Sequence, residues 1–374
     1  MYYQRVIHGD IEKWLDKPEV IIIYGARQVG KTTLLKKLIE NRNDALLLNC
    51  ETPSVSQMLE TRDTSAINAL FSGKKIIGLD EAQSIQEVGK LLKLIYDNMP
   101  QFKLIVTGSS SFELAGQLGE PLTGRNIKIR LLPLSLSEIS NSKSFSWALE
   151  NLNTLLVFGA YPGMMDTDDK QRKLSELAGD YLYKDILAFE KVRNPMIIRK
   201  LLKALALQVG SEVSVNELSN MLGVSRYVVE NYLDVLEKCF ILFHLDAYSS
   251  KQRNEIRKSK KYYFYDNGIL NAVTGNFNPV QNRNDAGSLW ENFCISERLK
   301  HNLNNNRYTR EYFWRTYDGA EIDLVEETSG KLKAFEFKFG LKRKKCIPDS
   351  FSSAYNVDEL TVITPETIHL LMDL

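Results

Sequence analysis

The sequence predicts an α/β protein that opens with a mostly parallel β-sheet and continues into further domains. Up to about residue 137, short apolar runs alternate with amphipathic stretches, which is the pattern of strands joined by crossover helices. The chain has 374 residues, more than one hydrophobic core usually supports. We therefore expect residues 1–137 to form the first of several domains.

Five short runs in this first domain are expected to be strands. Four of them are continuous apolar runs, as expected when helices cover both faces of a sheet. The five runs are 20–24, 45–49, 75–79, 103–107 and 126–131.

A glycine-rich motif lies between the first predicted strand and the next helix. Residues 25–32 match G-x-x-x-x-G-K-[ST], in which the glycines let successive backbone N–H groups face phosphates. Lys31 is expected to reach the β- and γ-phosphates of ATP, and the Thr32 hydroxyl to take one magnesium position. The predicted nucleotide contacts are Gly25, Ala26, Arg27, Gln28, Val29, Gly30, Lys31, Thr32 and Thr33.

A pair of acids follows the third predicted strand. Asp80 and Glu81 come at its carboxyl end, the edge where ligands bind in open α/β sheets. Asp80 is expected to orient Mg²⁺ through water, and Glu81 to polarise a water for attack on the γ-phosphate. A helix-capping pair of acids is the alternative. The fourth strand ends near Ser109, whose hydroxyl would lie beside the γ-phosphate or simply cap a helix.

Two helical segments follow the first domain. Residues 138–194 are broken by a turn from Gly159 to Gly163, and we interpret them as a helical lid over the nucleotide. Residues 195–275 have helix-turn-helix spacing: Gly223 ends one helix and Ser225 caps the next. Two alternating stretches, 240–247 and 261–265, then predict the strands of a wing, and hence a winged-helix domain.

Electrostatic attraction of DNA or RNA must rest on local patches, because the net charge of +1 provides no overall attraction, and the sequence has two basic runs. Each run is also compatible with a solvated loop. The helix that would enter DNA is acidic at Glu230, Asp234 and Glu237, so we expect it to recognise DNA poorly. It could instead brace the lid. The runs comprise Lys251, Arg253, Arg257, Lys258, Lys260 and Lys261 at the wing, and Lys342, Arg343, Lys344 and Lys345 near the C-terminus.

The last domain, residues 287–374, is expected to begin with a helix over 289–300 and to contain strands at 310–316, 320–326, 332–339 and 359–363. Alternation in the second and third strands directs Asp323, Glu336 and Lys338 away from the apolar face. Two carboxylates and a lysine in this pattern would bind magnesium and stabilise charge on a phosphodiester. A half-solvated hairpin with ordinary ion pairs is the alternative.

The composition, the cysteine spacing and the apolar segments together predict the cellular compartment. The composition, 44% hydrophobic and 25% charged, is that of a globular protein. Four scattered cysteines lack the paired spacing of a zinc site or a disulfide framework, which indicates a reducing compartment. The start of the chain has no apolar signal region, and no apolar stretch is long enough to cross a bilayer. We therefore expect a cytoplasmic protein without membrane contact.

The first domain resembles the AAA-superfamily ATPases. The P-loop, the DEAQ beginning at Asp80, the TGSSS from Thr107 and the LTGR ending at Arg125 occur in the order typical of that superfamily. The resemblance implies that Ser109 is the polar sensor and that Arg125 is an arginine finger acting on a neighbouring subunit of a homo-oligomer. A surface loop arginine is the alternative. The GAYPG turn at Tyr161 is similar to the lid motif of signalling NTPases, although a plain helix break fits equally.

The whole chain resembles a prokaryotic family of AAA ATPases with a C-terminal restriction-endonuclease-like, PD-(D/E)xK, domain of unknown function. The matching motifs are YLYKD at 181–185, YFYD at 263–266, LWEN at 289–292, FWRT at 313–316, EID at 321–323 and EFK at 336–338. By this resemblance Asp323, Glu336 and Lys338 form the nuclease-like site. Glu291 is its additional acid in preference to Glu297.

Two functional hypotheses follow. In the first, ATP hydrolysis drives a machine or switch that acts on nucleic acid through the winged-helix and nuclease-like domains. In the second, the protein is a regulatory NTPase whose last domain is an inactive scaffold for protein interaction. Salt-dependent binding of DNA or RNA distinguishes them.

Overall fold

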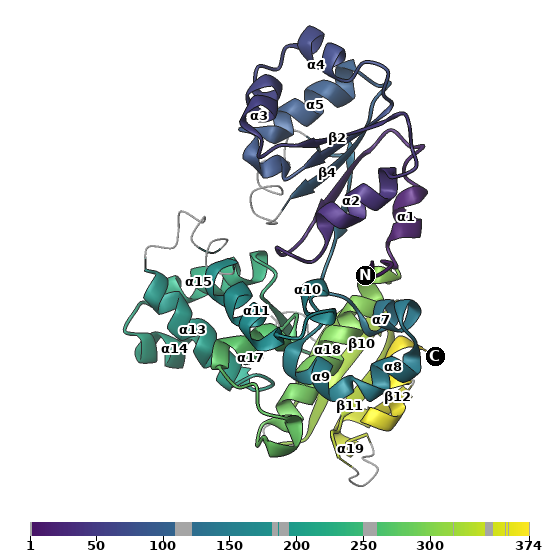
Figure 1. Cartoon of the computed structure of the whole chain (residues 1–374). Coiled ribbons are helices and arrows are strands. Elements are labelled where there is room, and N and C mark those ends of the chain that lie inside the picture. Colours follow the sequence, from purple (N-terminus) through teal and green to yellow (C-terminus); the bar gives the residue numbers. More distant parts are fainter. Residues whose placement is uncertain are drawn as a thin grey trace. The chain divides into compact units, whose positions relative to one another are not determined.

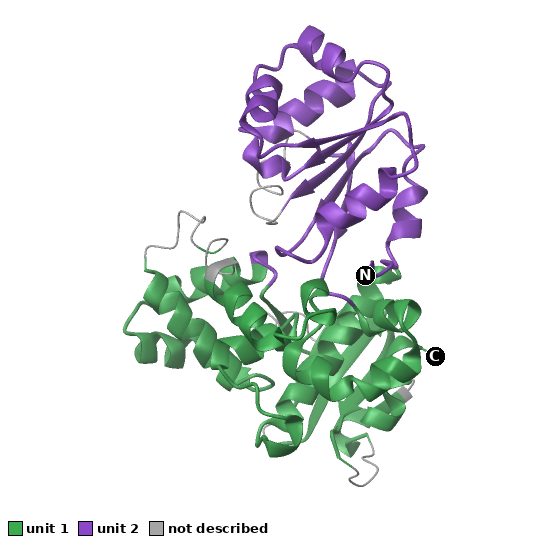
Figure 2. Cartoon of the chain, viewed as in Figure 1, with its two compact units in different colours: residues 1, 135–237, 241–374 green, residues 2–134, 238–240 purple. Residues whose placement is uncertain are grey.

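The structure, a computed structural model, describes residues 2–108, 122–181, 186, 194–249, 260–316, 318–340, 347–355, 357 and 359–373. The chain forms two compact units, shown in Figure 2. The N-terminal unit (purple) comprises Tyr2–Leu134 and Lys238–Phe240, and the C-terminal unit (green) comprises Ser135–Glu237 and Ile241–Leu374. Among the described helices, none combines the length and the apolar character needed to span a lipid bilayer.

The N-terminal unit is built on a five-stranded sheet of order β2-β3-β4-β1-β5, in which every pair is parallel (Figure 1). The five predicted strands are confirmed. Their bounds are β1 Val20–Tyr24, β2 Ala45–Asn49, β3 Ile76–Asp80, β4 Lys103–Gly108 and β5 Asn126–Arg130. The helices are α1 His8–Glu12, α2 Lys31–Ile39, α3 Pro53–Glu60, α4 Thr64–Leu70 and α5 Val88–Asn98, with a 3-10 turn η1 at Ala82–Ser84.

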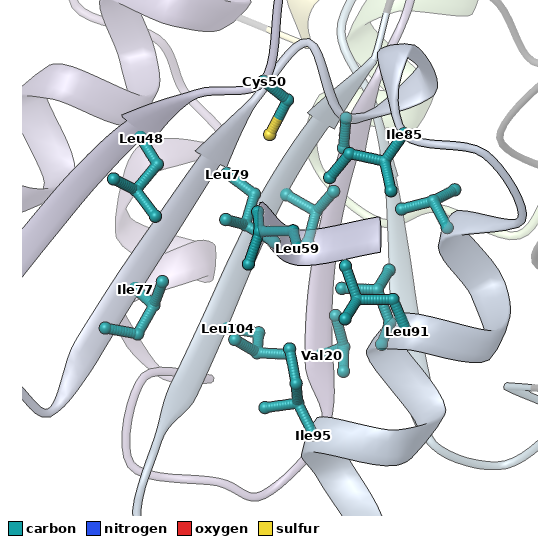
Figure 3. Packing of buried hydrophobic residues seen from close by; sticks show 14 of the residues in the cluster. Val20, Leu48, Cys50, Leu59, Ile77, Leu79, Ile85, Leu91, Ile95 and Leu104 are labelled. Atoms are coloured by element: carbon teal, nitrogen blue, oxygen red, sulfur yellow. The ribbon is translucent and has the colours of Figure 1, made fainter. Parts of the chain in front are cut away.

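Apolar side chains pack on both faces of this sheet. On one face, Leu91 and Ile95 of α5 and Leu59 of α3 belong to the same buried cluster as strand residues such as Ile77 (Figure 3). On the other face α2 packs against β3 and β4, and a Cβ atom at Gly78 would come within 3.2 Å of Leu35. Burial on both faces explains why these strands are continuously apolar.

The C-terminal unit contains one seven-stranded mixed sheet of order β12-β11-β10-β9-β7-β8-β6. The strands expected for the wing and those expected for the last domain lie in this same sheet, because β7 pairs in parallel with β9. The expected boundary between 195–275 and 287–374 therefore divides a continuous sheet. The strand bounds are β6 Glu212–Val213, β7 Leu242–Ala247, β8 Lys260–Phe264, β9 Arg310–Arg315, β10 Glu321–Thr328, β11 Lys331–Phe337 and β12 Glu359–Ile363.

Helices surround this sheet. The helix-turn-helix spacing is confirmed, with Ser225 capping α15 through the Val228 amide. The longest helix, α18, packs against both β8 and β11. The α-helices are α7 Leu136–Ser142, α8 Phe145–Glu150, α9 Leu152–Phe158, α10 Pro162–Met165, α11 Lys170–Glu176, α13 Pro195–Leu207, α14 Val215–Leu222, α15 Arg226–Lys238, α17 Asn267–Thr274, α18 Ala286–Asn304 and α19 Asp349–Ser352. The π-helix η2 spans Leu177–Tyr181, and the 3-10 helices η3 and η4 span Val280–Asn282 and Pro365–Met372.

The segment interpreted as a lid, 138–194, belongs to the C-terminal unit. Its helix α9 packs against α17 and α18, and α11 packs against α17. A Cβ atom at Gly159, which has a φ of 69°, would lie 1.9 Å from the carboxylate of Asp266, and that carboxylate accepts a hydrogen bond from the Ala160 amide. The turn after α9 is thus fixed by close contact with the end of the YFYD motif, which explains its glycine better than a plain helix break does.

Candidate functional site

The P-loop connects β1 to α2 in a conformation that requires its glycines. A Cβ atom on Gly25 would lie 2.0 Å from the carbonyl oxygen of Leu131, closer than real Cβ contacts come. Gly30 has a φ of 98° and precedes the first turn of α2. Gly25 therefore has no room for a side chain, and Gly30 has a backbone conformation that favours glycine, so the loop can keep its backbone N–H groups turned toward an anion at the helix N-terminus.

Lys31 lies at the centre of this loop. The residue is only 4% exposed, and its Nζ donates hydrogen bonds to the carbonyls of Gly25 at 3.0 Å and Ala26 at 2.8 Å. Its ammonium group is therefore held against the loop that would receive the phosphates. Of the other predicted contacts on α2, Thr33 is exposed.

Asp80 joins the two motifs of the site. Its Oδ1 accepts hydrogen bonds from the hydroxyls of Thr32 at 3.0 Å and Thr107 at 2.5 Å. These side chains come from α2, β3 and β4, so the parallel register of the sheet assembles three oxygen groups at its carboxyl edge. Carboxylate and hydroxyl oxygens are ligands that Mg²⁺ accepts, and the set formed by Thr32 and Asp80 fits that ion.

Glu81 follows in a left-handed conformation with a φ of 53°. Its backbone N–H donates to the Thr107 hydroxyl at 3.1 Å, and its carboxylate accepts a hydrogen bond from Gln83 at 2.5 Å. A non-glycine residue in this region is strained, and such strain clusters at functional sites. The carboxylate of Glu81 therefore has a different hydrogen-bond partner from that of Asp80.

Cys50 is a neighbour of this site that the motifs do not indicate. It is fully buried, and its backbone N–H donates to the carbonyl of Asp80 at 2.9 Å. Burial raises the pKa of its thiol to about 12, and the carboxylates of Asp80 and Glu81 contribute to the increase. Cys50 is therefore a neutral packing residue beneath the acids.

The AAA resemblance predicts two further residues of this site, Ser109 and Arg125. Ser109 lies outside the described residues. Arg125 precedes β5, whose first residue pairs with the first residue of β1, so it is at the opposite edge of the sheet from the P-loop. There its Nε donates to Asp97 at 2.9 Å. A role as an arginine finger toward another subunit stays a prediction.

A second polar cluster lies in the C-terminal unit and contains the four residues predicted for the nuclease-like site. Lys338 Nζ lies 2.8 Å from Glu336 and 3.4 Å from Asp323. The carboxylate of Asp323 also accepts a hydrogen bond from the Phe337 amide at 2.8 Å, just beyond Leu324–Phe335, where the β10–β11 pairing ends. The diverging strands thus hold Asp323, Glu336 and Lys338 together.

A β-bulge changes the alternation expected in β10. Its register with β9 shifts between Ile322 and Val325, and these two residues share one apolar cluster. The bulge adds one residue to β10 between Ile322 and Val325, so Val325 shares the apolar cluster of Ile322 and Leu324 does not, although all three side chains are buried. Bulges commonly re-aim a side chain next to a functional site, and here the bulge includes Asp323.

Glu291 extends the cluster from α18. Its Oε1 accepts a hydrogen bond from the Tyr263 hydroxyl at 2.8 Å and lies 3.7 Å from Lys261 Nζ, which also forms an ion pair with Glu321. Lys261 is 1% exposed. The sequence places Lys261 in the basic run at the wing, but in the structure β8 directs it into the acid cluster. Sequence reasoning missed this role because nothing local distinguishes Lys261 from the neighbouring lysines.

Burial determines the electrostatics of this cluster. It raises the pKa of Glu291 to about 7, and the adjacent carboxylate of Asp323 adds to the increase. For Lys338, burial acts to lower the pKa, but the carboxylates of Asp323 and Glu336 outweigh it and the pKa is raised. Asp323 is 7% exposed and Glu336 2%, so the half-solvated hairpin is excluded. Within the described ranges, no three His, Cys, Asp or Glu side chains are arranged to hold a metal ion.

Other residues of the quoted motifs have structural roles. The side chain of Asn292 accepts a hydrogen bond from the Phe264 N–H at 2.7 Å and donates one to the Phe264 carbonyl at 3.1 Å. These two bonds attach α18 to β8. Glu297, the second choice for the additional acid, pairs with Lys300 and accepts the Leu136 amide. Most of the two basic runs and of the YLYKD motif, at 250–259, 341–346 and 182–185, lies outside the described residues.

Comparison with known proteins divides the chain into three parts. Residues 17–140 match the family model of an AAA domain. Residues 149–280 and 286–370 match two domains of unknown function, DUF8612 and DUF4143. The border between them, at 280–286, falls between α17 and α18.

Similar proteins span most of the chain. An uncharacterised protein of Methanocaldococcus jannaschii is 29% identical over 69% of this chain, which spans 63% of that protein's length. An uncharacterised protein of Mycobacterium tuberculosis is 28% identical over 88% of this chain and 72% of its own length. A Walker-type ATPase of Pyrococcus abyssi aligns with a TM-score of 0.49 and 17% identity, over 71% of this chain and 94% of its own. Residues 17–140, which contain the P-loop, are therefore similar to the AAA domains of P-loop ATPases.

Proposed function

We propose that this chain binds ATP with Mg²⁺ and hydrolyses it, and that the hydrolysis cycle drives an action of the C-terminal unit on nucleic acid. The observation that carries the ATPase proposal is the group formed by Lys31, Thr32 and Asp80, in which the two motifs of the AAA domain meet. Both motifs are needed for nucleotide hydrolysis, and the sheet brings them together without a ligand.

Each residue of this group has a distinct role in the proposed reaction. Lys31 and the loop amides bind the β- and γ-phosphates, while Thr32 and Asp80 hold Mg²⁺, which neutralises phosphate charge when bound. Glu81 accepts the proton of the attacking water, and the amide of Gln83 orients its carboxylate.

The action on nucleic acid rests on the C-terminal unit. The elements α13, β6, α14, α15, β7 and β8 follow one another as in a winged helix, with β8 paired to both β6 and β7. The subsequent order of α18, three strands, α19 and β12 supports a restriction-endonuclease-like core, and its cluster includes Asp323, Glu336 and Lys338. DNA or RNA would contact the two basic runs.

One observation favours the alternative, a regulatory NTPase with an inactive C-terminal scaffold. The two described lysines of the acid cluster, Lys261 and Lys338, already form ion pairs with its carboxylates. In this alternative the cluster stabilises the fold, and hydrolysis resets a conformation that a protein partner recognises.

Three measurements on the purified full-length chain separate these proposals. Hydrolysis of ATP without added nucleic acid tests the ATPase. Binding of labelled DNA and RNA at low and high salt tests the action on nucleic acid, because phosphate contacts weaken steeply with salt. A magnesium-dependent cleavage assay of Asp323→Ala beside the parent tests nuclease chemistry. Absence of binding at low salt leaves only the regulatory NTPase, and equal cleavage by both proteins excludes Asp323 as a catalytic residue.

A further inference from the structure

Arg5 connects the P-loop to the end of β5. It precedes the region that matches the AAA family model, and it is buried, with 5% exposure. Its Nη1 donates to the carbonyl of Val29 at 2.8 Å, and its Nη2 donates to the carbonyl of Leu132 at 2.7 Å. The planar guanidinium has donors in a fixed geometry, so it sets the position of one carbonyl relative to the other.

The opposite end of the P-loop contacts the same short stretch. The Leu131 carbonyl occupies the space that a Cβ atom of Gly25 would need, and the Leu131 amide donates to Tyr24 at 2.8 Å. The loop is therefore held at its first residue by Leu131 and near its last residue by Leu132 through Arg5. Between these two points Gln28 has a φ of 60° and accommodates the curvature.

We propose that Arg5 is a positioning residue of the ATP site, and that it transmits the nucleotide state of the P-loop to residues 131–134. These residues lead directly into the C-terminal unit, which begins at Ser135. A shift of the Val29 carbonyl when phosphate binds must move the guanidinium or break one of its two hydrogen bonds. Either change alters the restraint on Leu132. This inference rests on the proposed ATPase function.

Ser135 and Leu136 continue this segment within the C-terminal unit. The Leu136 amide donates to Glu297 on α18, and Asn304 at the end of α18 donates to the Ser135 hydroxyl at 3.3 Å. The helix α18 also carries Glu291 of the acid cluster. A change at residues 131–134 therefore reaches a segment that is hydrogen-bonded to this helix.

The test compares Arg5→Ala and Arg5→Lys with the parent and with Arg62→Ala. Arg62 is a matched control in the same unit, because it also donates to a carbonyl, that of Gln86 at 3.2 Å. Calorimetry measures the affinity for ATP, and hydrogen–deuterium exchange with and without ATP follows the peptide over 131–136. We expect Arg5→Ala to weaken ATP binding about tenfold or more and to remove the effect of ATP on exchange. Arg5→Lys should be intermediate, and Arg62→Ala should resemble the parent.

Parent-like affinity and parent-like ATP-dependent exchange in Arg5→Ala would overturn the inference. If Arg5→Ala does not fold, as judged by circular dichroism, ATP affinity and exchange over 131–136 are measured on Arg5→Lys and decide the test. Lysine retains the positive charge but lacks the two separate guanidinium nitrogens that reach Val29 and Leu132. If ATP does not change hydrogen–deuterium exchange over 131–136 in the parent, the proposed transmission from the P-loop to these residues is refuted. A parent that binds no ATP instead refutes the ATPase proposal, which distinguishes the two failures.

Discussion

The hydroxyl of Thr32 donates a hydrogen bond to Oδ1 of Asp80 at 3.0 Å across 48 residues of sequence. Thr32 lies in the first turn of α2 and Asp80 ends β3, so the bond joins the P-loop to the acid motif, with β4 between β3 and β1 in the sheet. Parallel strands end at the same edge of the sheet, which places the two groups together before any ligand binds. The predictions for the ATP site depend on this arrangement.

Replacing Lys31 by alanine should reduce the affinity for ATP on the order of 100-fold, because charged hydrogen bonds to phosphate are lost. Titration calorimetry with ATP and GTP measures the loss of affinity and the preference for adenine over guanine nucleotides. Lys36→Ala is the control, since Lys36 is an exposed lysine on the same helix. Nucleotide binding that is undiminished in Lys31→Ala would contradict the assignment.

Glu81→Gln should bind ATP as the parent does but hydrolyse it about 10²- to 10⁴-fold more slowly, because the amide cannot accept the proton of the attacking water. Steady-state phosphate release gives kcat, and calorimetry gives the affinity. Glu87→Gln serves as the control because Glu87 is an exposed acid in the same unit. A kcat for Glu81→Gln within about twofold of the parent value would exclude general-base catalysis by Glu81.

Glu291 should make the C-terminal unit less stable as the pH rises from about 4.5 to 7. Burial, followed by Asp323, raises its pKa in the folded state to about 7 from an ordinary 4.5. The Glu291 carboxyl then binds more protons in the folded state than in the unfolded state in that window, so its contribution to stability is greatest below pH 4.5 and declines through pH 7. Glu291→Gln should remove roughly 2 to 3 kcal/mol of this decline.

Urea unfolding at several pH values, followed by tryptophan fluorescence, measures the slope. Trp147, Trp290 and Trp314 all lie in the C-terminal unit and report mainly on it. Glu150→Gln, at an exposed position of the same unit, should retain the parent slope. An unchanged slope in Glu291→Gln would show that this carboxyl group does not control the pH dependence.

Lys261→Met should destabilise the C-terminal unit by about 3 to 5 kcal/mol near pH 8, because it leaves Glu291 and Glu321 without their buried cation. The loss should be smaller near pH 5, where Glu291 is protonated. Adding Glu321→Gln to Lys261→Met should restore part of the stability, since it removes one uncompensated charge. Thermal unfolding of the two variants at both pH values checks this, and equal losses at pH 5 and pH 8 would argue against a charge effect.

The parallel sheet, its five strands and the P-loop could be predicted from the sequence alone because they are encoded locally. A buried parallel strand is a short apolar run, and a phosphate-binding loop needs glycines and a lysine at fixed spacing. The grouping of Glu291, Asp323, Glu336 and Lys338 came from a family resemblance. The alternation of polar and apolar residues in these strands is by itself also compatible with a half-solvated hairpin.

Only the tertiary structure decided which distant side chains complete these sites. Arg5 and Lys261 carry no motif, and their roles follow from burial beside Val29 and Glu291. The bulge at Asp323 and the joining of β7 to β9 depend on pairing between strands, which local periodicity does not contain. Local patterns determine backbone conformation, whereas long-range packing determines which charged groups are buried together, and burial sets their chemistry.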